Sequence, residues 1–113
     1  MIWRISNRAT FQLLARSGAR ARQGPIAVRF LRVDPTAPPR VAYTVSRRVG
    51  GAVVRNRVRR RLRAGVQLHR AMLVDGAAYL VSAEPEAART ESVELHRAVH
   101  DVLAKARATL MNP

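Results

Sequence analysis

The segment from Ala52 to Leu73 constrains the fold more than any other part of the sequence. Its apolar residues recur at helical spacing, which predicts one helix of roughly twenty residues. The apolar stripe is mostly valine and suits packing on a sheet, whereas a helix lying on a membrane would carry bulky Trp, Phe or Leu. The stripe consists of Val54, Val58, Leu62, Val66 and Leu73, with Gly65 and Met72 beside it. The opposite side carries Asn56, Arg57, Arg59, Arg60 and Arg63, and Arg55 and Arg61 flank the stripe.

Positive charge is concentrated around this predicted helix. Residues 1–74 hold seventeen basic residues and one acid, Asp34, whereas residues 75–113 hold four basic residues and six acids. A helix that carries arginines without neighbouring carboxylates tolerates self-repulsion, which a docked anion would relieve. The formal net charge of +14 therefore points to a polyanion as partner, either nucleic acid or an anionic membrane surface.

Composition and length exclude several classes of protein. The 113 residues favour a single domain, and 48% apolar residues supply a core for it. The sequence has no cysteine, which rules out disulfides, Cys-ligated zinc and thiol catalysis. No apolar run reaches the ~20 residues that span a bilayer, and the N-terminus lacks the apolar core of a signal peptide. The protein is therefore expected to be cytoplasmic with no membrane partner, and residues 1–5 are expected to be a mobile, disordered terminus that includes Trp3.

Alternation and turn residues predict the remaining elements. A short first helix is expected to be capped by Ser6 or Asn7 and to stop at Gly18. Strands are expected over 25–33 and 40–48, joined by a proline-rich turn into an antiparallel pair, and a buried strand is expected over 77–83. The last helix is expected to be capped by Thr90, with an apolar face of Leu95, Val99, Val102, Leu103, Ala106 and Leu110. This order predicts an α+β or α/β sandwich of one sheet and its helices.

The stretch RVAYTVSRRVGGAVVRNRVRRRLR, residues 40–63, resembles the signature of the bacterial ribonuclease P protein component family. Its core is Arg55-Asn56-Arg57, and the order of elements matches over nearly the whole chain. The resemblance implies an α+β fold similar to the second domain of ribosomal protein S5. The implied order is α-β-β-(β)-α-β-α, with an unusual left-handed βαβ crossover around the central helix.

The same resemblance implies a function. In this family the catalyst is an RNA subunit, and the protein aids the endonucleolytic removal of the 5′ leader from precursor tRNA. No catalytic residue and no metal ligand is therefore expected in the protein, and Mg²⁺ is expected mainly on the RNA. The residues implied to contact the RNA subunit are Arg55, Asn56, Arg57, Arg59, Arg60 and Arg63. A cleft between the first helix and the sheet is implied to hold the leader, with Phe11, Tyr43, Ser46, Arg47 and Arg48 in or beside it.

The sequence departs from the family pattern at three places. Ala15 stands where the family often has a second aromatic residue, Gly51 where it often has Asn, and Ala83-Glu84 where a basic residue is common. A stack of a base on an aromatic ring is worth about 1–3 kcal/mol. Fewer aromatic platforms therefore predict weaker binding of single-stranded RNA.

Other functions stay open on the sequence alone. The alternative is a general RNA-binding or RNA-chaperone module without a nuclease role, whereas DNA binding is not expected because no helix-turn-helix pair is apparent. A nuclease that acts unaided through two metal ions needs clustered carboxylates, and the acids here are scattered. His96 and His100 have a spacing that can bind a metal on a helix, but no third ligand is evident, so these and His69 are interpreted as surface histidines.

Overall fold

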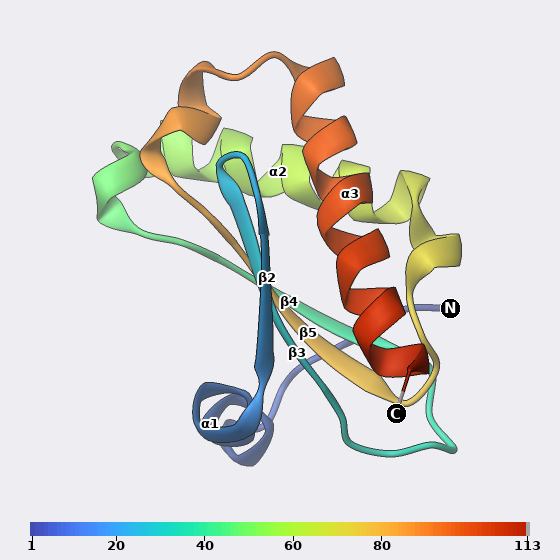
Figure 1. Cartoon of the computed structure of the whole chain (residues 1–113). Helices are drawn as coiled ribbons and strands as arrows, with labels where there is room; N and C mark the ends of the chain where they lie inside the picture. The colour runs from blue at the N-terminus through green and yellow to red at the C-terminus, as the bar shows by residue number, and fades with distance from the viewer. Residues whose placement is uncertain (113) are drawn as a thin grey trace.

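The computed structural model describes residues 1–112, in which a five-stranded sheet carries helices on both faces (Figure 1). The strand order across the sheet is β1-β4-β5-β3-β2. The elements are β1 (Trp3–Arg4), α1 (Arg8–Ser17), β2 (Ala19–Gln23), β3 (Ile26–Arg32), β4 (Arg40–Val45), α2 (Ala52–Leu68), β5 (Ala77–Ala83) and α3 (Ser92–Met111). Three short 3₁₀ turns, η1 (Arg47–Val49), η2 (Arg70–Met72) and η3 (Pro85–Arg89), connect them.

β5 occupies the centre of the sheet. It pairs in parallel with β4, where Tyr79 lies opposite Val41, and antiparallel with β3, where Tyr79 lies opposite Phe30. The predicted antiparallel pairing of strands 25–33 and 40–48 is therefore wrong, because β5 lies between them. The physical reason is that β5 is apolar on both faces: Ala77, Ala78, Tyr79 and Val81 are all buried. Such a strand is stabilised most where both faces of the sheet are covered.

The two edge strands carry little signal in the sequence. β2 has the sequence ARARQ, which shows little of the apolar patterning of a strand, and it is held by pairing with β3. β1 lies in the terminus for which the sequence predicts disorder. In the structure the Trp3 amide donates to the Pro39 carbonyl at 2.8 Å, and Ile5 is buried. The N-terminal residues thus continue the sheet beyond β4.

Two apolar clusters lie on the two sides of the sheet. The larger one packs the sheet against α2 and α3 and contains Val58, Leu62 and Val66, which are fully buried. These residues confirm the predicted stripe. The smaller cluster joins α1, through Leu14, to Ile5 and the opposite face of the sheet. α2 and α3 therefore cover one face, and α1 covers part of the other (Figure 1).

α2 is shorter than the periodicity predicts, since it ends at Leu68 rather than at Leu73. The chain turns at His69, and the Leu73 amide donates to the Arg70 carbonyl at 3.1 Å within η2. Leu73 is still buried, but it reaches the core from outside the helix. A side chain at helical spacing can therefore enter the core after the helix has stopped.

The helix ends match the predictions at α1 and differ at α3. Asn7 caps α1 by accepting from the Thr10 amide at 2.7 Å, and Gly18 ends the helix as predicted. Thr90 does not cap α3, because its hydroxyl donates to the Glu86 carbonyl at 2.8 Å and it closes η3 instead. The residue before α3 is Glu91. The strand predicted over 40–48 likewise ends earlier, at Val45.

Candidate nucleic-acid interface

The arginines of α2 divide between two edges of the helix. Arg59 and Arg63, one turn apart, lie on the edge nearest β4, beside Tyr43. Arg57 and Arg60 lie on the other side, which faces the start of α3. Helical spacing predicts one exposed face, and most of its residues are exposed. The sheet and α3 flank the helix, so a hollow lies along each edge of this face.

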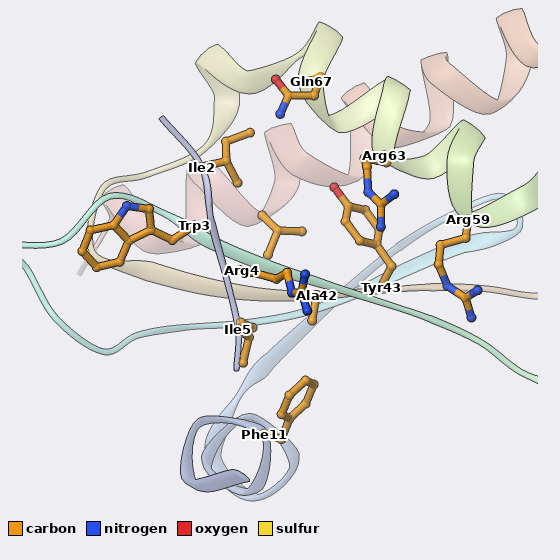
Figure 2. Close-up of a pocket in the computed structure, with 11 residues that line it drawn as sticks. Ile2, Trp3, Arg4, Ile5, Phe11, Ala42, Tyr43, Arg59, Arg63 and Gln67 are labelled. Carbon is orange, nitrogen blue, oxygen red and sulfur yellow. The ribbon is translucent and has the colours of Figure 1, made fainter. Parts of the chain in front are cut away.

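A groove of about 400 Å³ lies on the β4 side of α2 (Figure 2). Segments from β1, α1, β4 and α2 surround it, so residues from distant parts of the chain meet there. No carboxylate is among its lining residues within the described part of the chain. Its aromatic residues are Trp3, Phe11 and Tyr43, and its arginines are Arg4, Arg59 and Arg63. Aromatic rings interleaved with guanidinium groups form a surface that suits single-stranded nucleic acid.

Tyr43 and Arg63 interact at the centre of this groove. The Arg63 guanidinium lies over the Tyr43 ring, 5.5 Å from its centroid, a cation–π contact. Burial raises the pKa of the Tyr43 hydroxyl to about 12, although the positive charge of Arg63 opposes this shift. Tyr43 is therefore neutral near pH 7, and Arg63 is held with its charge at the groove.

The positive charge of α2 is not neutralised within residues 1–112. The ion pairs there involve Arg22, Arg40 and His100, none of which belongs to α2. On the helix itself, the Arg59 guanidinium donates to the Asn56 side-chain oxygen at 2.9 Å, which orients the group without cancelling its charge. The helix therefore presents a positive potential on both edges.

A second hollow, of about 300 Å³, lies between α2 and the start of α3. Arg57, Arg60 and Arg61 line it together with Ser92 and His96. The Arg61 guanidinium donates to the Thr90 carbonyl at 3.2 Å, which ties α2 to the turn that precedes α3. The hollow can accept an anion from the side opposite the groove.

The structure brings together only part of the predicted leader cluster. Phe11 and Tyr43 both line the groove, and Figure 2 shows Phe11 pointing from α1 toward the sheet. Ser46, Arg47 and Arg48 do not line it, since they are exposed at η1 beyond the end of β4.

Most of the predicted cluster for the RNA subunit lies at the surface, and Arg55 is the exception. Asn56, Arg57, Arg60 and Arg63 are exposed, and Arg59 is partly buried beside the groove. Arg55 lines neither hollow, and its buried Nε atom has no hydrogen-bond partner among the described residues. Arg55 thus lies on the core side of the first turns of α2, as its place beside the apolar stripe implies.

Several groove residues were missed in the sequence. Trp3 and Arg4 reach the groove only because β1 pairs with β4, which no local pattern signals. Gln67 follows Arg63 by one turn, so the helical period of α2 could have identified it. The helical period places Arg61 beside the stripe, and the packing of α3 makes that edge part of the second hollow.

The three histidines gather where the end of α2 meets α3. The rings of His69 and His100 have centroids 4.9 Å apart, and His100 lies 3.0 Å from the Asp101 carboxylate. Burial, followed by the nearby His100 and His96, lowers the pKa of His69. Across residues 1–112, no group of three or more His, Asp or Glu side chains is placed to hold a metal ion.

In the same range, no helix has the length and apolar character needed to cross a membrane.

Known proteins resemble this chain in sequence and in structure. The family profile described as ribonuclease P matches residues 2–107. A ribonuclease P protein component from a Nocardioides species is 39% identical over 107 residues, covering 93% of this chain and 92% of that protein. The corresponding protein of Thermobifida fusca is 38% identical over 99 residues, covering 81% of this chain and 67% of that protein.

Two solved structures share the fold. The RNase P protein of Staphylococcus aureus superposes with a TM-score of 0.81 at 24% identity, covering 92% of this chain and 94% of that chain. The RNase P protein from Thermotoga maritima superposes with a TM-score of 0.80 at 19% identity, covering 90% and 96%. These two similarities confirm the predicted α+β sandwich of one sheet and its helices.

Proposed function

This chain belongs to the ribonuclease P protein component family, and from that membership we propose that it is the protein subunit of a ribonucleoprotein endoribonuclease. The complex would remove the 5′ leader from precursor tRNA in the cytoplasm. Catalysis is assigned to the RNA subunit, which would also hold most of the Mg²⁺. The protein contributes binding and charge rather than catalytic groups.

The observation that carries this proposal is the groove in which Phe11 and Tyr43 meet Arg59 and Arg63 (Figure 2). Aromatic rings stack on unpaired bases, and guanidinium groups bind phosphates through paired N–H donors. A single-stranded leader presents both bases and phosphates along one path. The absence of a carboxylate among the described lining residues keeps the path attractive to RNA.

α2 is proposed to lie between the RNA subunit and the 5′ leader of the precursor tRNA. The side that faces solvent and α3 would contact the RNA subunit, and the edge near β4 would contact the leader. The residues proposed for the RNA subunit are Arg55, Asn56, Arg57, Arg59, Arg60 and Arg63, of which Arg59 and Arg63 would also bind leader phosphates from the β4 edge. Those proposed for the leader are Phe11, Tyr43, Ser46, Arg47 and Arg48, of which the last three would follow the leader past the end of β4.

This position supports a simple electrostatic role. Where the leader and the RNA subunit converge, their phosphates repel each other, and the arginines of α2 would lower that repulsion. The complex would then form at lower magnesium, because fewer cations are needed to screen the RNA backbones.

The test is cleavage of precursor tRNA by the RNA subunit with wild-type protein or with the double variant Arg57→Ala, Arg60→Ala. We expect the double variant to lower kcat/KM about 10-fold or more at physiological salt and magnesium, since hydrogen bonds to charged groups are worth about 1.5–3 kcal/mol each. The matched control is Arg89→Ala with Arg97→Ala, which removes the same charge from exposed positions outside the groove and the second hollow. Equal kcat/KM values for the two double variants would refute the assignment of Arg57 and Arg60 to the contact with the RNA subunit.

An RNA chaperone would behave differently in the same assay. At low magnesium, a chaperone would accelerate the folding of many unrelated RNAs, whereas a ribonuclease P subunit should rescue 5′ maturation specifically. Rescue of a self-cleaving ribozyme by equal amounts of protein would favour the chaperone.

A further inference from the structure

Trp3 is the single tryptophan of the chain, and it stands at one end of the residues that line the groove, with Arg59 at the other (Figure 2). It is 44% exposed, which makes it the most exposed aromatic residue of the groove. An exposed tryptophan has a large apolar surface that water solvates poorly. The groove therefore contains an exposed indole surface that a flat ligand can cover.

The backbone of Trp3 is held by the sheet. Its amide donates to the Pro39 carbonyl at 2.8 Å, and the Ile5 amide donates to the Val41 carbonyl at 3.4 Å. Ile5 is buried in the smaller core and anchors the end of this segment. The indole is therefore carried by a strand that is paired with β4. Because this backbone is already ordered, ligand binding loses little conformational entropy there.

One face of the indole is already backed by a cation. The Arg40 guanidinium lies 5.6 Å from the ring centroid, and it also pairs with the Asp34 carboxylate at 3.7 Å. Arg40 lies opposite Trp3 in the β1–β4 register, so the stack follows from strand pairing. A flat base that stacked on the other face would complete a sandwich of guanidinium, indole and base.

The other two aromatic residues of the groove are less free. The ring of Tyr43 is covered by Arg63, and Phe11 is 37% exposed at the edge of α1. α1 contributes one aromatic side chain to the groove, Phe11. Trp3 adds a second exposed aromatic side chain from a different element.

We propose that Trp3 is a base-stacking residue that binds an unpaired nucleobase of single-stranded RNA at the β1 end of the groove. This inference rests on the proposed function, since it extends the leader-binding groove by one position. Stacking is available to every base, so Trp3 would bind leaders of different sequence. The basic lining of the groove favours RNA over a peptide, because Arg4, Arg59 and Arg63 line it and can bind phosphates.

The first measurement uses the fluorescence of Trp3 itself, which no other tryptophan obscures. A short oligoadenylate is titrated into the protein at low salt, and binding is followed in parallel by anisotropy of a labelled oligoadenylate. We expect the tryptophan emission to be quenched with the same midpoint as the anisotropy change. Binding without quenching, or no binding at all, would overturn the proposal.

The second measurement compares three variants by anisotropy. Trp3→Leu keeps an apolar side chain on β1 but removes the stack, so affinity should fall about 5-fold or more. Trp3→Phe keeps an aromatic ring and should restore most of the affinity. Val53→Ala, at a position 81% exposed on α2 and outside the groove, should change nothing. Equal affinity of Trp3→Leu and Trp3→Phe would show that stacking is not involved.

Failure of this inference and failure of the proposed function are distinguishable, because the oligoadenylate assays need no RNA subunit. If the fluorescence of Trp3 does not change on binding while precursor tRNA cleavage is normal, only the stacking role of Trp3 is rejected. If Trp3 stacks on the oligoadenylate but the protein has no effect on cleavage by the RNA subunit, only the proposed function is rejected.

Discussion

Tyr43 shows how one side chain takes its properties from two elements. β4 places its ring at the groove, and α2 places Arg63 over that ring. Burial opposes ionisation of the hydroxyl more strongly than the arginine favours it, so the pKa rises to about 12. The sequence alone predicts a tyrosine on a strand and an arginine on a helix, without their contact.

A titration to alkaline pH tests this environment. Both tyrosines, Tyr43 and Tyr79, have pKa values raised by burial, so the folded protein should show little tyrosinate absorbance near the ordinary pKa of 10.0. In the unfolded chain the hydroxyls ionise from about pH 10. Because the folded state retains its protons, the stability contribution is complete below pH 10 and is lost as the pH rises toward about 12.

Tyrosinate absorbance and circular dichroism should be followed together, so that ionisation can be compared with unfolding. Tyr43→Phe should remove the component that titrates near 12. A folded protein in which half of the tyrosinate signal appears at pH 10 would contradict the buried environment of Tyr43.

At the scale of elements, α2 and α3 approach closely at Gly65. A methyl group added there would lie 3.1 Å from the His96 ring and 3.3 Å from a Val99 methyl group. The sequence places Gly65 beside the apolar stripe but does not show that α3 packs on it. A side chain at this position would require His96 or Val99 to shift, whereas glycine inside a helix is itself unfavourable by about 1 kcal/mol relative to alanine.

Gly65→Val should therefore lower the free energy of unfolding by about 1–3 kcal/mol, because the added methyl groups overpack the contact between the helices. Urea unfolding followed by circular dichroism measures the change. Ala64→Val is the matched control: Ala64 is the preceding residue of α2 and is exposed, so valine there costs only its helix propensity, roughly 0.5 kcal/mol. Similar losses from both substitutions would mean that the helices do not pack tightly at Gly65.

Local patterns predicted these elements well and their partners poorly. The Val58, Leu62 and Val66 stripe, the Asn7 cap and the strand from Ala77 to Ala83 were all visible, because each depends on neighbours in sequence. The position of that strand between β3 and β4 was not, because pairing is chosen by the burial that all strands achieve together.

At the scale of the whole molecule, charge is separated along the chain, and α2 lies at its most basic part. Residues 75–113 carry more acids than bases, yet none of their carboxylates pairs with α2 within residues 1–112. Among the described residues, no acid lines the groove or the second hollow.

Binding to RNA should consequently depend strongly on salt. The logarithm of the affinity for a single-stranded oligonucleotide should fall linearly with the logarithm of salt concentration, by about 0.7 per phosphate neutralised. Anisotropy titrations at several salt concentrations give this slope. Arg59→Ala with Arg63→Ala should flatten it, whereas Arg89→Ala with Arg97→Ala should leave it unchanged. A slope near zero for the wild type would contradict an electrostatic groove.

Local sequence patterns establish the apolar stripe of α2, the concentration of arginine on that helix and the resemblance of residues 40–63 to one family. These properties depend on residues close together in the chain. The tertiary structure alone decided that Arg59 and Arg63 face the groove while Arg57, Arg60 and Arg61 face α3. It also decided that Trp3 joins Phe11 and Tyr43, because β1 finds its place only when β4 offers an open edge. Contacts between distant segments are selected by the packing of the whole chain, and no local pattern records them.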